Sequence, residues 1–280
     1  MESPTPQPNP FMAAPPRLVP RIGGTAMPGG VHFSSGNYGT GPFWRLFLTG
    51  ASIMGLGALA MSLAYVISWS LGYGLHWPLA EALLGMGGLG NLPYPPLVQI
   101  GLNLLTFLCF LVVLRLSPLS GYHGAEHKVV HCLEHFGVID TQLAFTCPRA
   151  HVRCGTTLLA GFLPLPLIAI PLLGIPLVGP PAALAVLALG WMTRFRVGAV
   201  IQNVFTTKEP TPHQMDTAIQ AAETLLERWR QDPHRRVPLW SAIAVRGFPQ
   251  MVAGVIVSVS LLNWLETQLP FWLDFTHVLH

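Results

Sequence analysis

Residues 97–116 read LVQIGLNLLTFLCFLVVLRL, and Arg115 is the only charged residue among them. A helix needs about 20 predominantly apolar residues to cross the roughly 30 Å of hydrocarbon in a bilayer. Four further stretches of similar character lie at about 43–71, 156–177, 180–201 and 248–265. The sequence therefore predicts about five transmembrane helices.

The composition supports this class. Hydrophobic residues make up 51% of the chain and charged residues only 10%, with a mean hydropathy of +0.50, whereas soluble domains carry about 25% charged residues. We expect an all-α integral membrane protein with a His/Cys/Glu-rich helix and loop and an amphipathic helix on its cytoplasmic side. The net charge of +3 comes without a basic run interleaved with aromatic residues, so nucleic-acid binding is excluded. The predicted partners are the lipid bilayer and either other membrane proteins or a second copy of the chain.

The spans and the segments between them predict the organisation of the chain. The expected regions are a proline-rich disordered N-terminus (1–21), an irregular glycine-rich loop (22–42), a transmembrane bundle (43–205) with a cytoplasmic His-rich insert (117–155), an amphipathic helix (206–236), and a C-terminal membrane segment with its tail (237–280). The prolines of 156–177 predict kinks or a re-entrant shape, and Gly179-Pro180-Pro181 predicts a tight hairpin before the fourth span. Residues 72–96 are expected at the membrane surface.

The distribution of basic residues predicts the orientation. In a five-span arrangement all fifteen Lys and Arg residues fall on one side, and the loop 72–96 has none. Because basic loops stay in the cytoplasm, the N-terminus is expected inside and the C-terminus outside. Arg194 and Arg196 fit this arrangement only if the fourth span ends near them. In a four-span alternative, residues 248–265 lie in the interface and the tail stays inside.

The polar insert contains an unusual concentration of ligand-forming residues, since 123–135 read HGAEHKVVHCLEH. His123, Glu126 and His127 form the pattern H-x-x-E-H, the inverted zincin motif. No Gly or Pro interrupts residues 125–136, so a helix is expected, and residues four apart share a face of a helix. His123 and His127 should therefore lie on one stripe, followed by either His131 or Glu134.

A second cluster, CPRAHVRC at 147–154, follows closely. Imidazole, carboxylate and thiolate groups bind borderline-soft cations such as zinc. The predicted ligands of a divalent metal, with zinc favoured, are His123, His127, His151, Cys154 and Glu134, the last as a ligand or as an acceptor that orients a ligand imidazole. Glu126 is the expected general base, and Arg149 and Arg153 are the expected binding residues for an anionic group of the substrate. A solvated polar loop is the alternative interpretation.

Residues 206–236 have the pattern of an amphipathic helix. Thr211-Pro212-His213-Gln214 resembles a capping box with proline at the first helical position. Apolar residues then recur at spacings of three and four, at Met215, Ile219, Ala222, Leu226 and Trp229. This stripe is expected to pack on the cytoplasmic face of the bundle.

Several motifs resemble the YqhQ-like family of bacterial membrane proteins, which are predicted metal-dependent enzymes of unknown reaction. These motifs are YHGAEHK at 122–128, HVRCGT at 151–156, TTKEP at 206–210 and GGTA at 23–26 followed by Gly30-Val31. They occur in the family's order and cover most of 22–230. The resemblance implies a multi-pass protein of the bacterial plasma membrane. Gly29 stands where the family usually has Glu, and His32 could take over the role of that residue.

Two functions are consistent with these features. The first is a metal-dependent hydrolase that acts at the cytoplasmic membrane face, on a lipid head group or on a peptide segment near the membrane. The second is a non-catalytic accessory or scaffold subunit whose metal site is structural. An open coordination position would distinguish the first from the second, because structural zinc sites are closed by four protein ligands.

Overall fold

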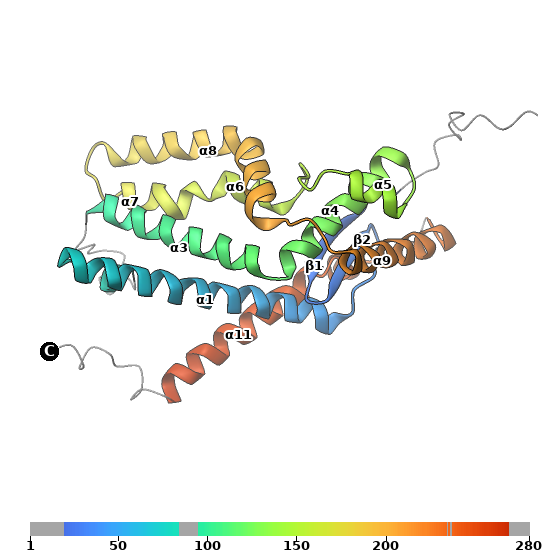
Figure 1. Ribbon diagram of the computed structural model, residues 1–280, viewed down its shortest axis with the longest axis horizontal. Coiled ribbons are helices and arrows are strands. Elements are labelled where there is room, and N and C mark those ends of the chain that lie inside the picture. Colours follow the sequence, from blue (N-terminus) through green and yellow to red (C-terminus); the bar gives the residue numbers. More distant parts are fainter. Residues whose placement is uncertain (1–19, 84–94, 234, 236, 269–280) are drawn as a thin grey trace, which may run out of the picture.

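Five long apolar helices form one end of the molecule, and a polar assembly of helices and strands forms the other (Figure 1). The computed structural model describes residues 20–83, 95–233, 235 and 237–268. The candidate spans are Phe43–Leu75, Pro96–Leu116, Gly155–Leu172, Gly179–Thr206 and Phe248–Leu265. These spans agree closely with the predicted ones, so the predicted fold class, an all-α multi-pass membrane protein, is confirmed.

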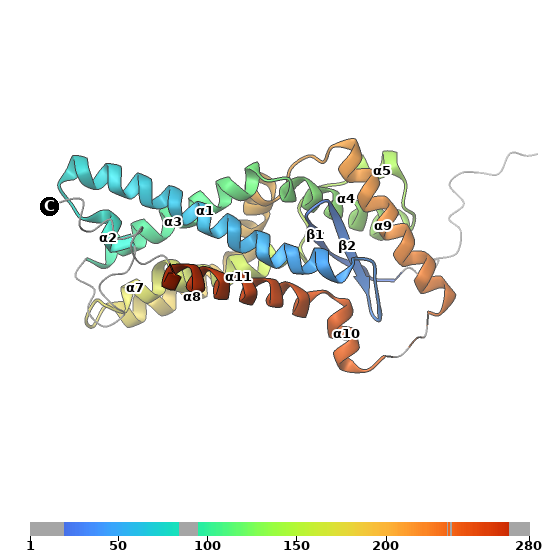
Figure 2. The same ribbon diagram turned by 90° about the horizontal axis from the view of Figure 1, so that it is seen from below.

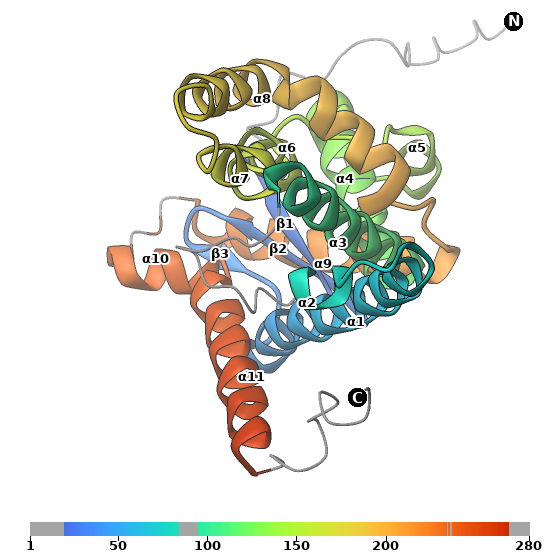
Figure 3. The ribbon, with the colours of Figure 1, turned by 90° about the vertical axis from the view of Figure 1, so that its left-hand side faces the viewer.

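The spans correspond to the following elements. The helices are α1 (Phe43–Leu75), α3 (Pro96–Leu116), α6 (Gly155–Phe162) continued by η1 (Leu165–Ala169) and α7 (Ile170–Leu172), α8 (Gly179–Ile201) continued by η2 (Gln202–Thr206), and α11 (Phe248–Gln268). Seen end-on, α3 lies between α1 and the α6–α8 pair (Figure 3). Short α2 (Leu79–Leu83) packs at the end away from the polar assembly.

Proline shapes the third span as expected. Pro164 precedes η1, a short π-helix. Backbone hydrogen bonds in a π-helix join residues five apart instead of four apart. The hairpin that follows differs slightly from the prediction. Gly179, Pro180 and Pro181 form the first turn of α8 rather than the connection, because proline is well suited to the first turn of a helix, where no N–H partner is needed.

The C-terminal helix α11 packs along α1 (Figure 2). The two helices approach closely at glycine, since a Cβ atom on Gly50 would collide with the carbonyl of Met251 and one on Gly254 with the carbonyl of Phe47. Small residues at such crossings allow backbone-to-backbone packing in a membrane. By contrast, nothing lies within 4 Å of a Cβ atom built on Gly55 or Gly57. Of these three glycines of α1, Gly50 is the one that lies at the helix crossing.

The glycine-rich segment is a small antiparallel sheet and not an irregular loop, so this prediction was wrong. Strands β1 (Gly23–Met27), β2 (Gly30–Ser35) and β3 (Tyr38–Gly39) pair in sequence order. Pro28 and Gly29, the latter with a φ of +74°, connect the first two strands, as in a turn that needs a left-handed third residue. Glycine weakens the strand signal in a sequence, and packing against two helices supplies the missing stability.

Those two helices are α4 (Leu119–Phe136) and α9 (Pro212–Gln231), which cover the sheet at the polar end (Figure 1). Their shared core is apolar and fully enclosed, and it includes Phe33, Val129, Leu133, Met215 and Leu225. The capping box of Thr211 and Gln214 is present at the start of α9. The amphipathic stripe therefore packs on β2 and α4 rather than directly on the spans.

The remaining helices are α5 (Thr141–Thr146) and α10 (Leu239–Val245), which connect α4 and α11 to the rest of the polar end. The predicted disorder of the N-terminus concerns residues 1–19, outside the described residues. The same holds for residues 84–94 of the predicted surface segment and for the tail after residue 268.

The α1–α11 crossing predicts an asymmetric response to alanine. Gly50→Ala and Gly254→Ala should destabilise the protein by about 1–3 kcal/mol, because each added methyl group must displace the facing backbone. Gly55→Ala and Gly57→Ala serve as matched controls on the same helix. Thermal unfolding in detergent measures the difference, and equal melting temperatures for all four variants would contradict the packing described.

Candidate metal centre

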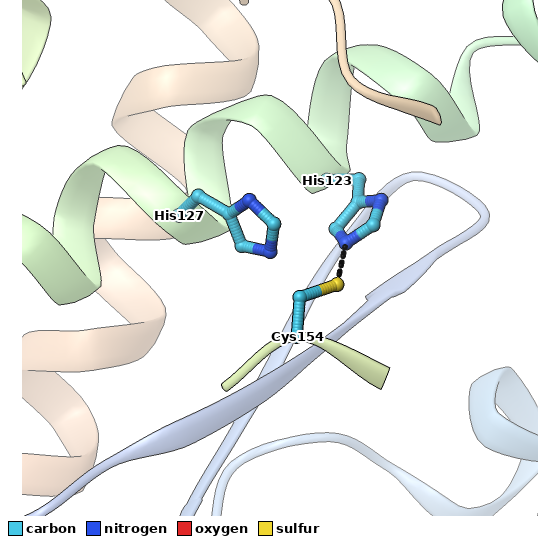
Figure 4. Close-up of side chains that lie close together, drawn as sticks. All are labelled: His123, His127 and Cys154. Atoms are coloured by element: carbon cyan, nitrogen blue, oxygen red, sulfur yellow. Dashed lines mark hydrogen bonds between the residues drawn. The ribbon is translucent and has the colours of Figure 1, made fainter. Parts of the chain in front are cut away.

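Helix α4 carries the H-x-x-E-H pattern of His123, Glu126 and His127 into the interior of the polar end. His123 and His127 project from neighbouring turns of one face, and their ring centroids are 4.4 Å apart. Cys154, which caps the start of α6, approaches them from the opposite side (Figure 4). The predicted helix and the predicted stripe of these two histidines are both present.

The side chains of His123, His127 and Cys154 each offer a ligand atom, and these atoms all lie within 4.8 Å of one another. His123 Nε2 and Cys154 Sγ are 3.3 Å apart. Ligand atoms around a tetrahedral zinc ion with bonds of 2.0–2.3 Å are separated by about 3.5 Å. The three donors therefore need only small side-chain adjustments to share one cation.

Hydrogen bonds preset both imidazoles for this role. His123 Nδ1 lies 3.0 Å from the carbonyl oxygen of Thr206, and His127 Nδ1 contacts the carbonyl oxygen of Arg149. A carbonyl oxygen only accepts, so each Nδ1 carries the proton and donates it. Each Nε2 atom consequently carries a lone pair, and that of His123 accepts the thiol proton of Cys154, another member of the group. This is the tautomer that a metal site requires.

Burial favours the neutral forms of two of these candidate ligands, His127 and Cys154. The pKa of His127 is lowered well below its ordinary value, chiefly by desolvation and further by neighbouring His123. Desolvation raises the pKa of the Cys154 thiol, although hydrogen bonds from Thr156 oppose the shift. A bound divalent cation would reverse the second effect, because coordination deprotonates a thiol. All four cysteines are free.

Glu126 lies beside this group and is only 7% exposed. Its carboxyl group rests directly on the backbone of Gly24, where a Cβ atom would collide with it. Burial raises the pKa of Glu126 to about 7, partly offset by His123. A carboxyl group with a pKa near neutrality can both accept and return a proton. Position 24 therefore needs a glycine, because any side chain there would collide with Glu126.

His151 and Glu134, also predicted as ligands, are not part of the three-residue group. Arg153 N donates to His151 Nδ1 over 3.1 Å, so the proton lies on Nε2, which donates to Glu134 Oε2 over 3.2 Å. Both ring nitrogens of His151 are therefore engaged. The His127 and His151 rings are nevertheless neighbours, with centroids 5.9 Å apart.

The two predicted substrate-binding arginines already have carboxylate partners. Arg149 lies with its Nε 3.5 Å from Glu209 Oε2, and Arg153 forms an ion pair with Glu134. Arg153 also lines the cavity described below. Their role toward a substrate remains a prediction.

Lys128 is buried despite its charge, since its side chain is 5% exposed. Its ammonium group donates to the carbonyls of Phe145 and Cys147 over 2.7 and 2.9 Å and pairs with Glu209 at 2.8 Å. These three contacts compensate its desolvation. The segment before Cys154 and the segment after η2 are thereby attached to α4.

Two contributors to the site were not identified from the sequence. Gln202, 1% exposed, accepts from His151 N over 2.7 Å and donates to Thr157 Oγ1 over 2.8 Å. A polar residue at the end of an apolar span was the available signal. The backbone carbonyl of Thr206 left no such signal, because any residue type provides one.

His32, considered as a substitute for the glutamate of the family motif, has a different place. Gly41 N donates to His32 Nδ1 over 2.7 Å, so Nε2 carries the proton and donates to the carbonyl of Val245 over 2.9 Å. His32 pairs in the sheet with Thr25 and links β2 to α10. Its neighbour on β2, Phe33, pairs with Gly24, which contacts Glu126. Because adjacent strand residues face opposite sides of a sheet, His32 faces away from Glu126.

The group of His123, His127 and Cys154 opens into a cavity of about 500 Å³. One side is polar and consists of His123, Glu126, His127 and Cys154, and the other is apolar and comes from the spans α1, α3 and α6. Strand β1 forms a third wall. Ligand pockets typically measure about 300–1,000 Å³, so the cavity is large enough for a small substrate or part of a longer one.

The raised pKa of Glu126 predicts a pH-dependent stability in metal-free protein. The pKa rises from 4.5 to about 7 on folding, so the group favours the folded state below pH 4.5 and this advantage is lost as the pH rises through about 7. Glu126→Gln abolishes this loss. Relative to wild type, the variant should gain up to about 3 kcal/mol between pH 5 and pH 8.

Thermal unfolding in detergent with a chelator at the two pH values tests this expectation. Glu223→Gln, at an exposed position of α9, is the control for removal of a surface carboxylate. If the melting temperature of Glu126→Gln follows that of wild type at both pH values, the raised pKa of the buried Glu126 carboxyl group is contradicted.

Comparison with known proteins supports the family resemblance. Residues 51–178 match the family described as "Protein of unknown function (DUF1385)". The chain is 29% identical over 148 residues to "Uncharacterized protein YqhQ" of Bacillus subtilis (strain 168), which is 44% of this chain and 46% of the relative's length. The chain thus spans less than half of that relative, and no solved structure matches. The predicted resemblance to the YqhQ-like family is therefore confirmed, through the relative and through the match of residues 51–178 to DUF1385.

Proposed function

We propose that this protein is a metal-dependent hydrolase of the membrane surface, with a divalent cation, most simply zinc, held by His123, His127 and Cys154. The observation that carries the proposal is the convergence of three donors with preset tautomers and a buried carboxyl group in one cavity. Three protein ligands leave a position open, which is the pattern of catalytic rather than structural zinc sites.

The residues of the chain then have distinct roles. A bound cation would supply Lewis-acid activation of water and of the bond to be cleaved. Glu126 accepts a proton from the attacking water and returns it to the leaving group, for which a pKa of about 7 is well matched. His151, held by Glu134 and Gln202, orients the loop that carries Cys154. Arg153 offers a positive charge at the cavity wall.

Elemental analysis of detergent-purified protein tests the metal site. We expect about one equivalent of zinc or another transition metal in wild type, lost in His127→Ala and in Cys154→Ser because each removes one of three ligands. His135→Ala is the matched control on the same helix, since this residue is exposed. His151→Ala should retain the metal at reduced affinity, about 10–100-fold lower, as is typical when an outer partner is removed.

Two results would separate this proposal from the accessory or scaffold alternative. A correctly folded wild-type protein without metal, even after incubation with zinc, would contradict the metal site itself. A tightly bound metal that cannot bind an added small thiol or hydroxamate would indicate a closed structural site. This result would contradict the hydrolase.

We also propose that the site faces the cytoplasm of a bacterial cell, with the N-terminus inside. Basic residues gather at the polar end, including Arg45 at the start of α1 and Arg115 at the end of α3, and basic segments remain cytoplasmic. Leu177, 93% exposed between α7 and α8, should then lie outside. Leu177→Cys in intact spheroplasts should react with a membrane-impermeant maleimide, and the unsubstituted protein gives the background. Labelling only after lysis would reverse the orientation.

A further inference from the structure

Strand β1 is an edge strand whose outer side has no partner within the described part of the chain. It pairs with β2 alone, from Gly23 with Ser34 to Met27 with Gly30. In an antiparallel hairpin closed by a two-residue turn, the closing pair exchanges both hydrogen bonds and alternate pairs do not. Counted from Met27 and Gly30, the backbone N–H and C=O groups of Gly24 and Ala26 point away from β2.

This outer edge borders the candidate metal centre. Five consecutive residues, Ile22 to Ala26, line the same cavity as His123, Glu126 and Cys154. Consecutive strand residues alternate between the two faces of a sheet, so a cavity that touches all five runs along the edge, where the backbone groups project. The strands of the hairpin are visible behind Cys154 and His123 in Figure 4. Gly24 also contacts the carboxyl group of Glu126.

An open edge of this kind has a specific chemical preference. Unpaired backbone groups of an edge strand bind an extended chain by adding it as a new strand, and natural proteins usually cover or charge such edges. Within the described residues, the backbones of Gly24 and Ala26 form no hydrogen bond outside the hairpin. A lipid has no regular series of alternating donors and acceptors with which to satisfy these groups.

The opposite wall of the cavity indicates the side chains that such a chain would carry. It consists of apolar residues from three spans, among them Ile53 of α1, Phe110 of α3 and Leu159 of α6. Ile53 and Leu159 are 42% and 52% exposed on the apolar part of the molecule. The cavity therefore borders the region where lipid would lie, and apolar side chains can reach it from the bilayer.

From this arrangement we propose that the substrate is an extended, apolar peptide segment of a membrane-associated polypeptide, bound as an additional strand on the outer edge of β1. The inference rests on the proposed hydrolase function for its chemistry, but the binding mode does not require the metal. A strand added to β1 lies about 4.7–4.9 Å from it, which places its backbone beside Glu126 and the three ligands.

The reaction is then hydrolysis of a peptide bond. The oxygen of a water molecule bonds to the carbonyl carbon while Glu126 accepts one of its protons, and the C–N bond breaks. The leaving nitrogen takes this proton and departs as an amine, and the other product is a carboxylic acid. Water is the only co-reactant.

Binding to metal-free protein tests the edge pairing separately from catalysis. The probe is a fluorescein-labelled mixture of apolar peptides of about eight residues, followed by anisotropy in detergent with a chelator. Ala26→Pro removes one outward N–H group and no ladder bond, a position at which an edge strand tolerates proline. We expect at least about tenfold weaker binding, with the melting temperature and the metal content retained.

N-methylated peptides provide a second test that leaves the protein unchanged, in case Ala26→Pro does not fold. Peptides methylated at every second residue keep one free hydrogen-bonding edge and should bind. Peptides methylated at every residue should not, although they are more apolar. Newly formed amino termini, detected by mass spectrometry with zinc-loaded wild type and absent with Glu126→Gln, would support the cleavage step.

The outcomes distinguish failure of the inference from failure of the proposed function. Absence of peptide binding, or binding that is indifferent to both N-methylation and Ala26→Pro, would overturn the edge-pairing inference and indicate at most an apolar or lipid-binding groove. Binding with the expected dependence in a protein that takes up no metal would keep the inference about the binding mode and overturn the hydrolase. Metal uptake without peptide binding would overturn the inference about the binding mode and leave the hydrolase standing.

Discussion

The buried ammonium group of Lys128 is the interaction on which the arrangement of the candidate site depends. An unpaired charge in the interior is prohibitively costly, and here two carbonyls at the C-terminal end of α5 and the carboxylate of Glu209 compensate it. One side chain therefore attaches to α4 both the segment that leads to Cys154 and the segment that follows η2. The first segment supplies the thiol of the site, and the second directly follows Thr206, whose carbonyl orients His123.

The histidines of the polar end divide into two groups according to their hydrogen bonds. In His123 and His127 the Nδ1 atom donates to a backbone carbonyl, so the lone pair lies on Nε2. In His151 both nitrogens are engaged, with Arg153 N and Glu134. All three have the residue type of a ligand, but only His123 and His127 can bind a cation without giving up a hydrogen bond to a residue outside the group, since the partner of His123 Nε2 is Cys154. The site thus has an inner group of donors and an outer group that supports the loop.

Position relative to the bilayer is the second determinant of function. Helices α1, α3 and α6 begin or end at the level of the site, so the same cavity has an apolar wall from the spans and a polar wall from α4. Strand β1 adds a wall whose hydrogen-bonding groups belong to the backbone. A cavity with these three walls suits a ligand that is apolar in its side chains and polar along its chain, which is the reason for proposing an extended peptide rather than a lipid as the substrate.

The elements that depend on local pattern could be predicted from the sequence. The five spans follow from runs of apolar residues, α4 from an uninterrupted helical stretch that places His123 and His127 one turn apart, and the start of α9 from the capping box of Thr211 and Gln214. Each of these depends on residues close together in the chain. The strong helical and hydrophobic periods were therefore sufficient.

The features that depend on contacts between distant segments could not be predicted in this way and emerge from the fold. The glycine-rich segment becomes a sheet because α4 and α9 cover it, Lys128 is buried because carbonyls from another segment receive it, and Gly24 matters because Glu126 rests on it. Cys154 joins the inner group while His151 remains outside it, although both lie in the same short motif. Hydrogen bonds and close contacts between segments far apart in the sequence leave no periodic signal, and they select the geometry of the site.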